Sequence, residues 1–238
     1  MTYRTRIALL AAVTALVATL VIVAVVAGPS GTGSGSGSPK GTSEAGFDGA
    51  ALPPGVRAKP FTLTALASPP GEASIGGGGG LAGGPAGGSH GGTVSLAQFA
   101  GKVVVMAFLY PGCGHTCTLI ADQIRGALDE LGREPAVVIV DASQTDGTHA
   151  RARGRVHRIF EETGLAGRAY YLTGSQRQLK VVWRAYGVVP ASAGKAKFDE
   201  YAQVLLIDGK GNERVLFGAE DLTAEGLAHD VGRLQTGA

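Results

Sequence analysis

The feature that most constrains the fold is a pair of cysteines, Cys113 and Cys117, which follow directly after the apolar run 103–109 and are the only cysteines in the chain. The run has no polar alternation, as is typical of a strand buried on both faces. A helix-like apolar pattern comes next. Residues four apart in a first helical turn have Cα atoms about 6 Å apart, within the range that a disulfide tolerates. The sequence therefore predicts a dithiol at the junction between a buried strand and a helix.

Two chemical roles suit such a pair. The thiols can exchange with a disulfide, or they can hold Cu(I), because soft sulfur ligands select that ion. The N–H groups of a helix start stabilise a thiolate, so we expect at least one cysteine to be accessible and reactive. The alternative is an inert bridge, which would add little stability because the closed loop is short. His115, which lies between the cysteines, either shifts their pKa, serves as an additional metal ligand or is a solvent-facing spacer.

The N-terminal part of the sequence indicates a membrane anchor. Residues 7–27 carry no charge, and about 20 apolar residues match the hydrocarbon core of a bilayer. Arg4 and Arg6 precede this segment and the next basic residue is Lys40, which predicts a cytoplasmic tail at 1–6 and an extracytoplasmic remainder. A cleaved signal peptide ending near Ala27 is the alternative, although the run exceeds a usual signal core. Both interpretations put the dithiol outside the cytoplasm, and the anchor would hold it at the cell membrane.

Glycine-rich composition divides the rest of the chain. Residues 28–57 are largely Gly, Ser, Thr and Pro at their start, which predicts a flexible linker before a domain at 58–236. A second glycine-rich stretch at 71–92 lies between two strand-like segments, and we expect it to be a loop insertion within that domain. The net charge is only +2, so nothing indicates the basic surface that a nucleic-acid-binding protein needs.

Strand-like and helix-like segments alternate beyond residue 93. Short β-branched runs indicate strands, and apolar residues at intervals of three and four indicate helices. In chain order we expect a strand at 103–109, a helix presenting Ile120, Ile124 and Leu128, a strand at 136–140 and a helix at 148–163. We then expect a strand at 169–172 and a helix capped by Ser175 and Gln178. A hairpin of 204–207 with 214–217 and a last helix through Leu227 and Leu234 complete the order. This order predicts an α/β fold of the thioredoxin type, with a central mixed sheet covered by helices on both faces.

Several motifs resemble those of the Sco (SenC-type) family. They are Val94–Leu96, Gly101–Val105, Phe108–Tyr110, the Cys-x-x-x-Cys pair, Ala185–Val188 and Leu206–Asp208. The three-residue spacer is the specific part, because ordinary thioredoxins have a shorter one. The resemblance covers roughly residues 58–236 and implies a membrane-anchored thioredoxin fold. It further implies that the protein handles copper or thiols while the copper centre of cytochrome c oxidase is assembled, through cysteines that correspond to Cys113 and Cys117.

The sequence departs from the family at one ligand position. The family's third copper ligand is a histidine in an Asp-His-Ser triplet, which corresponds here to Asp199, Glu200 and Tyr201. Glu200 therefore replaces the histidine, and a carboxylate is a poor ligand for Cu(I). If copper binds, the remaining candidates for a third ligand are His115, Glu200 or a residue of a partner.

These observations predict a thiol–disulfide exchange protein that needs no cofactor and acts on an extracytoplasmic protein bearing a disulfide or receiving copper. The alternative is a Cu(I)-binding metallochaperone without catalytic turnover. A redox sensor is a third interpretation, which the six-residue cytoplasmic tail does not favour.

Overall fold

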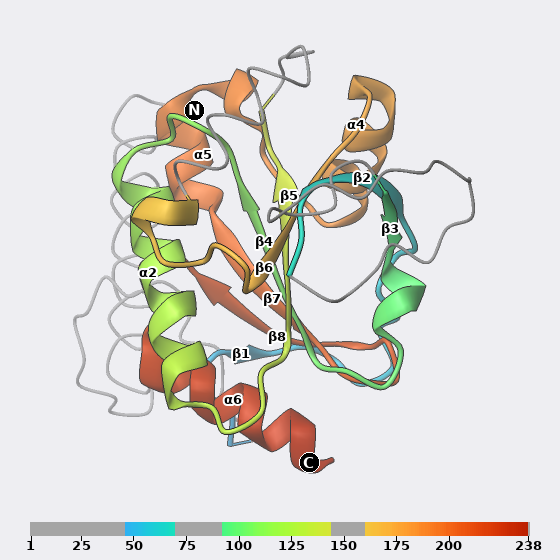
Figure 1. The fold of residues 1–238 in the computed structure, drawn as a ribbon, viewed down its shortest axis with the longest axis vertical. Helices are drawn as coiled ribbons and strands as arrows, with labels where there is room; N and C mark the ends of the chain where they lie inside the picture. Colours follow the sequence, from blue (N-terminus) through green and yellow to red (C-terminus); the bar gives the residue numbers. More distant parts are fainter. Residues whose placement is uncertain (1–45, 70–91, 144–159, 238) are drawn as a thin grey trace, which may run out of the picture. The chain divides into compact units, whose positions relative to one another are not determined.

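The computed structural model describes residues 46–69, 92–143 and 160–237, which contain an eight-stranded sheet in the order β1-β8-β7-β4-β5-β6-β2-β3 (Figure 1). The strands are β1 (Ala50–Ala51), β2 (Thr62–Ala67), β3 (Thr93–Ser95), β4 (Val104–Leu109), β5 (Ala136–Asp141), β6 (Ala169–Thr173), β7 (Gln203–Ile207) and β8 (Glu213–Gly218). The helices are η1 (Leu96–Phe99), α2 (His115–Glu130), α4 (Gln176–Ala185), η2 (Ala191–Ala193), α5 (Lys195–Tyr201) and α6 (Ala224–Thr236).

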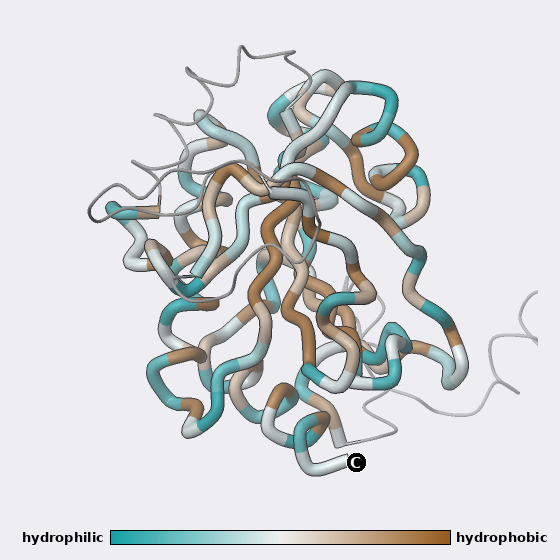
Figure 2. The backbone as a smooth tube through the Cα atoms, turned by 45° about the vertical axis from the view of Figure 1, so that its right-hand side comes forward, coloured by the Kyte–Doolittle hydropathy of each residue, from teal (hydrophilic) through white to brown (hydrophobic). Residues whose placement is uncertain are grey.

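Strand β4 lies inside the sheet and makes it mixed. It pairs in parallel with β5 and antiparallel with β7, so Met106 stands opposite both Val138 and Leu205. All six residues of β4 are buried, as are all six of β5, because helices cover both faces. Figure 2 shows hydrophobic residues concentrated along these central strands. The continuous apolar runs in the sequence are therefore the strands that lie between two layers of helix.

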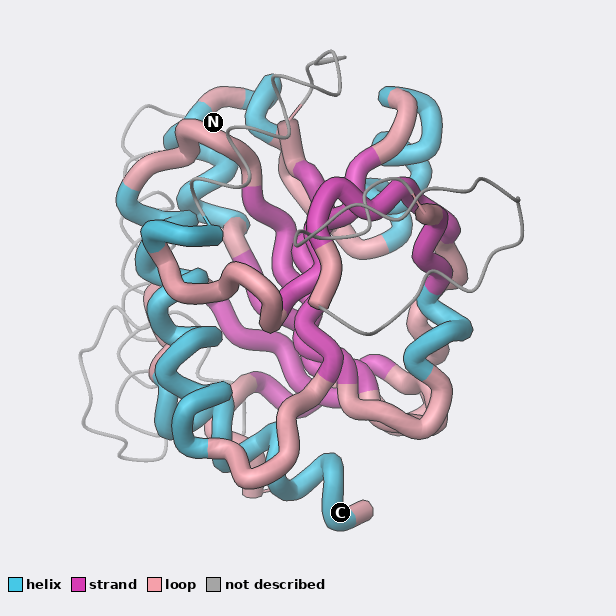
Figure 3. The backbone as a smooth tube through the Cα atoms, in the orientation of Figure 1, coloured by secondary structure: helices cyan, strands magenta, loops and turns pink. Residues whose placement is uncertain are grey.

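Helices flank the sheet on two sides, with α2 and α6 on one side and α4 on the other (Figures 1 and 3). The predicted stripe of α2 is confirmed, because Ile120, Ile124 and Leu128 are buried. In α4 the predicted capping box is present: the Ser175 side chain accepts a hydrogen bond from the Gln178 backbone N–H, and the Gln178 side chain accepts one from the Ser175 N–H. The predicted α/β fold of the thioredoxin type is confirmed for this domain.

The folded chain begins earlier than the sequence predicts. Residues 46–57 fall within the predicted linker at 28–57, but Phe47 is buried and β1 pairs with β8. The domain therefore starts before residue 58. The reason is tertiary: the carboxylate of Asp230 binds the backbone of this segment, and composition alone does not reveal that contact.

Other predicted segments lie outside the described residues. These are the tail at 1–6, the apolar segment 7–27, the first part of the linker, nearly all of the insertion at 71–92 and all but the end of the helix at 148–163. Within the described ranges, none of the helices is both long and apolar enough to cross a membrane. The strands that flank the insertion, β2 and β3, pair antiparallel, with Leu63 opposite Val94.

Candidate functional site

A tight turn connects the end of β4 to the start of α2 and carries both cysteines. The backbone N–H of Cys113 donates to the Tyr110 carbonyl at 3.2 Å, which closes the turn. Gly112 and Gly114 have φ angles of 97° and 75°, which side-chain-bearing residues rarely adopt. Gly114 is the N-cap of α2, so Cys113 precedes the helix and Cys117 lies in its first turn. The two glycines thus fold the chain back and bring the cysteines together.

The structure joins Cys113 and Cys117 in a disulfide, and their Cα atoms are 5.8 Å apart. This separation agrees with the spacing argument from the sequence. The Cys117 sulfur also lies 3.8 Å from the Tyr110 carbonyl oxygen. In the reduced protein a Cys117 thiol at this position has an acceptor within reach.

Both sulfurs are less accessible than the sequence argument requires. Cys113 is 0% exposed and Cys117 4% exposed, so the expectation of an accessible cysteine is wrong for this conformation. The neighbours Gly112, Gly114 and His115 are exposed. The disulfide therefore lies just beneath the surface, under a layer that the sequence did not predict.

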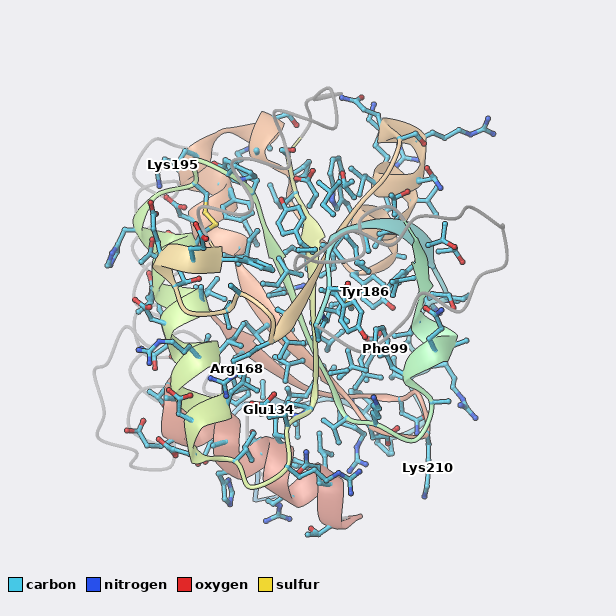
Figure 4. The ribbon with its side chains drawn as sticks, in the orientation of Figure 1. Phe99, Glu134, Arg168, Tyr186, Lys195 and Lys210 are labelled. Atoms are coloured by element: carbon cyan, nitrogen blue, oxygen red, sulfur yellow. A yellow bond between two sulfur atoms is a disulfide. The ribbon has the colours of Figure 1, made fainter. Side chains whose placement is uncertain are left out.

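Helix α5 packs against the cysteine turn through three residues of one face. The Phe198 ring meets the Tyr110 ring edge-on, with 4.8 Å between centroids. Lys195 approaches Gly114, where an added Cβ would lie 3.7 Å from Cε and 3.9 Å from Nζ of the lysine. Asp199 interacts with the Thr116 side chain. Figure 4 shows Lys195 close to the yellow disulfide bond.

Lys195 and Asp199 also form an ion pair along the helix, with 2.6 Å between Nζ and Oδ2. Hydrogen bonding from Lys195, with a weaker contribution from Thr116, holds the pKa of the Asp199 carboxyl below its usual value despite partial burial. The carboxylate is therefore charged at neutral pH. Sequence reasoning noted Asp199 only as part of a triplet and did not identify Lys195. Their spacing of four, in a Lys-x-x-Phe-Asp segment, was the available signal.

The other predicted ligands do not complete a metal site. Glu200 and His115 are both exposed, and His115 is the first residue of α2. Among the described residues, the one group of three or more side chains with converging ligand atoms is Asp48, His229 and Asp230, which contains neither cysteine. When the disulfide is reduced, the two thiolates can hold Cu(I), since soft sulfur suits that ion. Copper would then be cargo held by two sulfurs, with no third ligand prearranged in the described part of the chain.

Comparison with known proteins decides the family. A model of the SCO1/SenC family matches residues 88–235. The chain belongs to this family. The match includes β3 to β8 and both cysteines of this SCO1/SenC protein. A search of curated proteins gave no match.

Solved structures agree with the fold of this SCO1/SenC protein. BsSco, a Sco-family cytochrome c oxidase assembly protein with a disulfide switch, is 15% identical over 79% of this chain and 98% of its own, with a TM-score of 0.55. Yeast Sco1 with copper bound is 13% identical over 77% of this chain and 90% of its own, with a TM-score of 0.55. Apo Sco1 from Thermus thermophilus is 16% identical over 79% of this chain and 96% of its own, with a TM-score of 0.54. At such identities these structures bear on the fold alone.

Proposed function

We propose that this protein is a membrane-anchored, extracytoplasmic member of the SCO1/SenC family that uses Cys113 and Cys117 for thiol–disulfide exchange during copper-site maturation. One observation carries the proposal: the only two cysteines of the chain meet at the strand-to-helix junction, close enough to form a bond. The related structures support it, because they include a Sco protein with a disulfide switch and others with copper bound. The substrate we propose is a cysteine pair that must be reduced before it receives copper, as in cytochrome c oxidase.

The exchange balances with two cysteines. A thiolate of the reduced protein attacks the partner's disulfide, forms a mixed disulfide and releases one partner thiolate. The second cysteine then attacks the mixed disulfide, which releases the other partner thiolate and leaves the Cys113–Cys117 bond. The partner gains two electrons and this protein loses two. The N–H groups at the start of α2 favour a thiolate on Cys117, because the helix terminus carries partial positive charge.

Two single variants of the full-length protein, Cys113→Ser and Cys117→Ser, test the proposal. The substrate is a disulfide-bonded peptide of the Cys-x-x-x-Cys type, and its reduction is followed by mass spectrometry. We expect the reduced wild type to reduce the peptide and each single variant to fail. One variant should also accumulate a mixed disulfide, because the resolving thiol is missing. With no other cysteine in the chain, that adduct identifies the attacking sulfur. If both single variants reduced the peptide at the wild-type rate, the proposal would be wrong.

A second candidate function is Cu(I) delivery without redox turnover. The observation that favours it is the cysteine pair itself, together with the copper-bound yeast relative. Titration of the reduced protein with Cu(I) against a colorimetric chelator separates the two functions. Tight one-to-one binding that is lost in Cys113→Ser, without peptide reduction, would support the chaperone. Glu200→His provides a matched test, since it should tighten binding only if position 200 can reach the ion.

The anchor and the compartment are also part of the proposal, on the evidence of segment 7–27 and the arginines before it. We expect the protein to remain in the membrane fraction after a carbonate wash. In intact cells under reducing conditions, a membrane-impermeant maleimide should label the cysteines. Release by carbonate would exclude the anchor, and labelling only after lysis would exclude the extracytoplasmic location.

A further inference from the structure

Three side chains that can bind a metal converge where the first described segment meets α6. Nδ1 of His229 lies 2.8 Å from Oδ2 of Asp48 and 3.1 Å from Oδ1 of Asp230. All three ligand atoms lie within 4.8 Å of one another. The cluster is at the β1 edge of the sheet, three strand positions from β4, which leads into the dithiol. Its one imidazole and two carboxylates therefore form a second set of ligands, separate from the cysteines.

Hydrogen bonding alone balances this cluster poorly. Nδ1 of an imidazole carries one hydrogen at most, and here two carboxylates lie within its reach. Two carboxylates at this separation repel each other. Asp230 is held in place, because it is fully buried and accepts from the backbone N–H groups of Asp48 and Gly49. A divalent cation in place of the hydrogen would attract both carboxylates and offset their repulsion.

The spacing of the ligand atoms suits an ion of the zinc type. Tetrahedral Zn²⁺ with bonds of about 2.0–2.1 Å separates neighbouring ligand atoms by about 3.3 Å. The two measured separations from Nδ1 are shorter than this by about 0.2–0.5 Å. The side chains of His229 and Asp48 are 48% and 55% exposed, so they have room to rotate apart and to admit a water ligand.

The donor types also favour this class of ion. Imidazole together with carboxylate suits Zn²⁺, whereas Ca²⁺ takes six or more oxygen ligands. Arg233, on the next turn of α6, lies over the Phe47 ring at 5.1 Å from its centroid. Its positive charge opposes a bound cation, so we expect weaker binding than at a closed site with four protein ligands.

We propose that Asp48, His229 and Asp230 form a site for Zn²⁺ or a similar borderline divalent cation, which fastens the start of the folded domain to α6. Each side chain donates one atom, and water completes the coordination. Asp48 and Asp230 are 182 positions apart, so the ion links two ends of the domain. This inference does not depend on the thiol–disulfide function, because the site contains neither cysteine.

The test titrates the full-length protein in detergent with Zn²⁺ by isothermal calorimetry. The disulfide is kept oxidised, so that the sulfurs cannot take up the ion. We expect the wild type to bind at this site and to bind Ca²⁺ more weakly. Asp48→Asn and His229→Gln each remove one ligand at a half-exposed position. Each should weaken Zn²⁺ binding at least about tenfold, since losing even an outer partner of a ligand costs that much.

His115→Gln is the matched control, because His115 is an exposed histidine at the cysteine turn. We expect it to bind Zn²⁺ as the wild type does. At about a hundred times the measured dissociation constant, Zn²⁺ should raise the midpoint of thermal unfolding by about 5–10 °C in the wild type and in this control. The shift should be much smaller in the two ligand variants.

Hydrogen exchange of the wild type provides a readout that needs no variant. Zn²⁺ should slow exchange of the amides in residues 46–51, because the ion holds Asp48 to α6. Absence of Zn²⁺ binding, undiminished binding in both ligand variants or tighter binding of Ca²⁺ would overturn the inference. So would Zn²⁺ binding that leaves exchange at 46–51 unchanged. Ligand variants that unfold more easily, in a protein whose wild type does not respond to Zn²⁺, would show a hydrogen-bonded cluster only.

Discussion

Asp230, which is fully buried in α6, accepts a hydrogen bond at 2.9 Å from the backbone N–H of Asp48, a residue 182 positions earlier in the chain. Its other oxygen accepts from the N–H of Gly49 at 3.0 Å. The carboxylate therefore satisfies two donors of the segment that leads into β1. This contact fixes the first described residues to the last helix.

Replacing Asp230 by alanine should destabilise the domain. The substitution leaves two buried or partly buried N–H groups without an acceptor, which costs about 2–4 kcal/mol of unfolding free energy. Urea denaturation measures the loss, and hydrogen exchange should show it concentrated in residues 46–51. Glu220→Ala, at an exposed position, is the control and should change stability by about 0.5 kcal/mol or less. A loss no larger than that of the control would show that the carboxylate does not anchor this segment.

The turn of the β7–β8 hairpin should make stability depend on pH. Burial alone would raise the pKa of Asp208, but hydrogen bonds from Asn212, Arg214 and Lys210 outweigh burial and lower it. A lowered folded-state pKa adds stability above the unfolded-state pKa of about 3.9, and this stability is lost as pH falls through the folded value. Asp208→Asn should therefore cost about 2 kcal/mol at pH 7 and much less near pH 3, as measured by urea denaturation at both pH values. An equal cost at both would contradict the assignment.

Alanine at position 114 should strain the cysteine turn. Gly114 has φ 75° and ψ −138°, a conformation that costs a side-chain-bearing residue about 1–3 kcal/mol. Gly132→Ala is the matched glycine variant, because its φ is outside the strained range and an added Cβ would meet open space. It should be neutral or stabilising by up to about 1 kcal/mol. Thermal unfolding of the two variants checks the contrast, and equal stabilities would refute it.

Opening the disulfide should cost little stability. The bridge spans a sequence separation of four, so it restricts the unfolded chain only slightly, and the chain-entropy relation gives about 2 kcal/mol. Urea curves with and without dithiothreitol measure the difference. The double variant Cys113→Ser, Cys117→Ser should resemble the reduced protein. A loss above about 4 kcal/mol would indicate a structural bridge instead of a working one.

The central strands and the capped helix were predictable because local signals and tertiary packing agree there. The runs at 103–109 and 136–140 are short, apolar throughout and rich in valine, as is typical of strands covered on both faces. Ser175 and Gln178 satisfy each other's backbone N–H groups within four residues, so this helix start needs no distant partner.

The early start of the domain and the burial of the sulfurs depend on distant contacts. Residues 46–57 look like linker because the two-residue strand β1 has no periodicity of its own, and Asp230 holds the segment from α6. Helix α5 buries a single side chain, Phe198, so no apolar stripe indicates it. Sequence reasoning also placed a cysteine at the surface, whereas the structure buries both. Their spacing was predictable from the sequence, but their accessibility was not.

Both outermost strands of the described sheet are very short: β1 has two residues and β3 has three. An unpaired edge strand can form backbone hydrogen bonds with another chain, and an edge strand this short offers few of them. The native domain is therefore a poor seed for edge-to-edge stacking, even when many copies crowd together. Edge-to-edge pairing of the described sheet would therefore begin from molecules in which β1 or β3 has detached and left β8 or β2 unpaired.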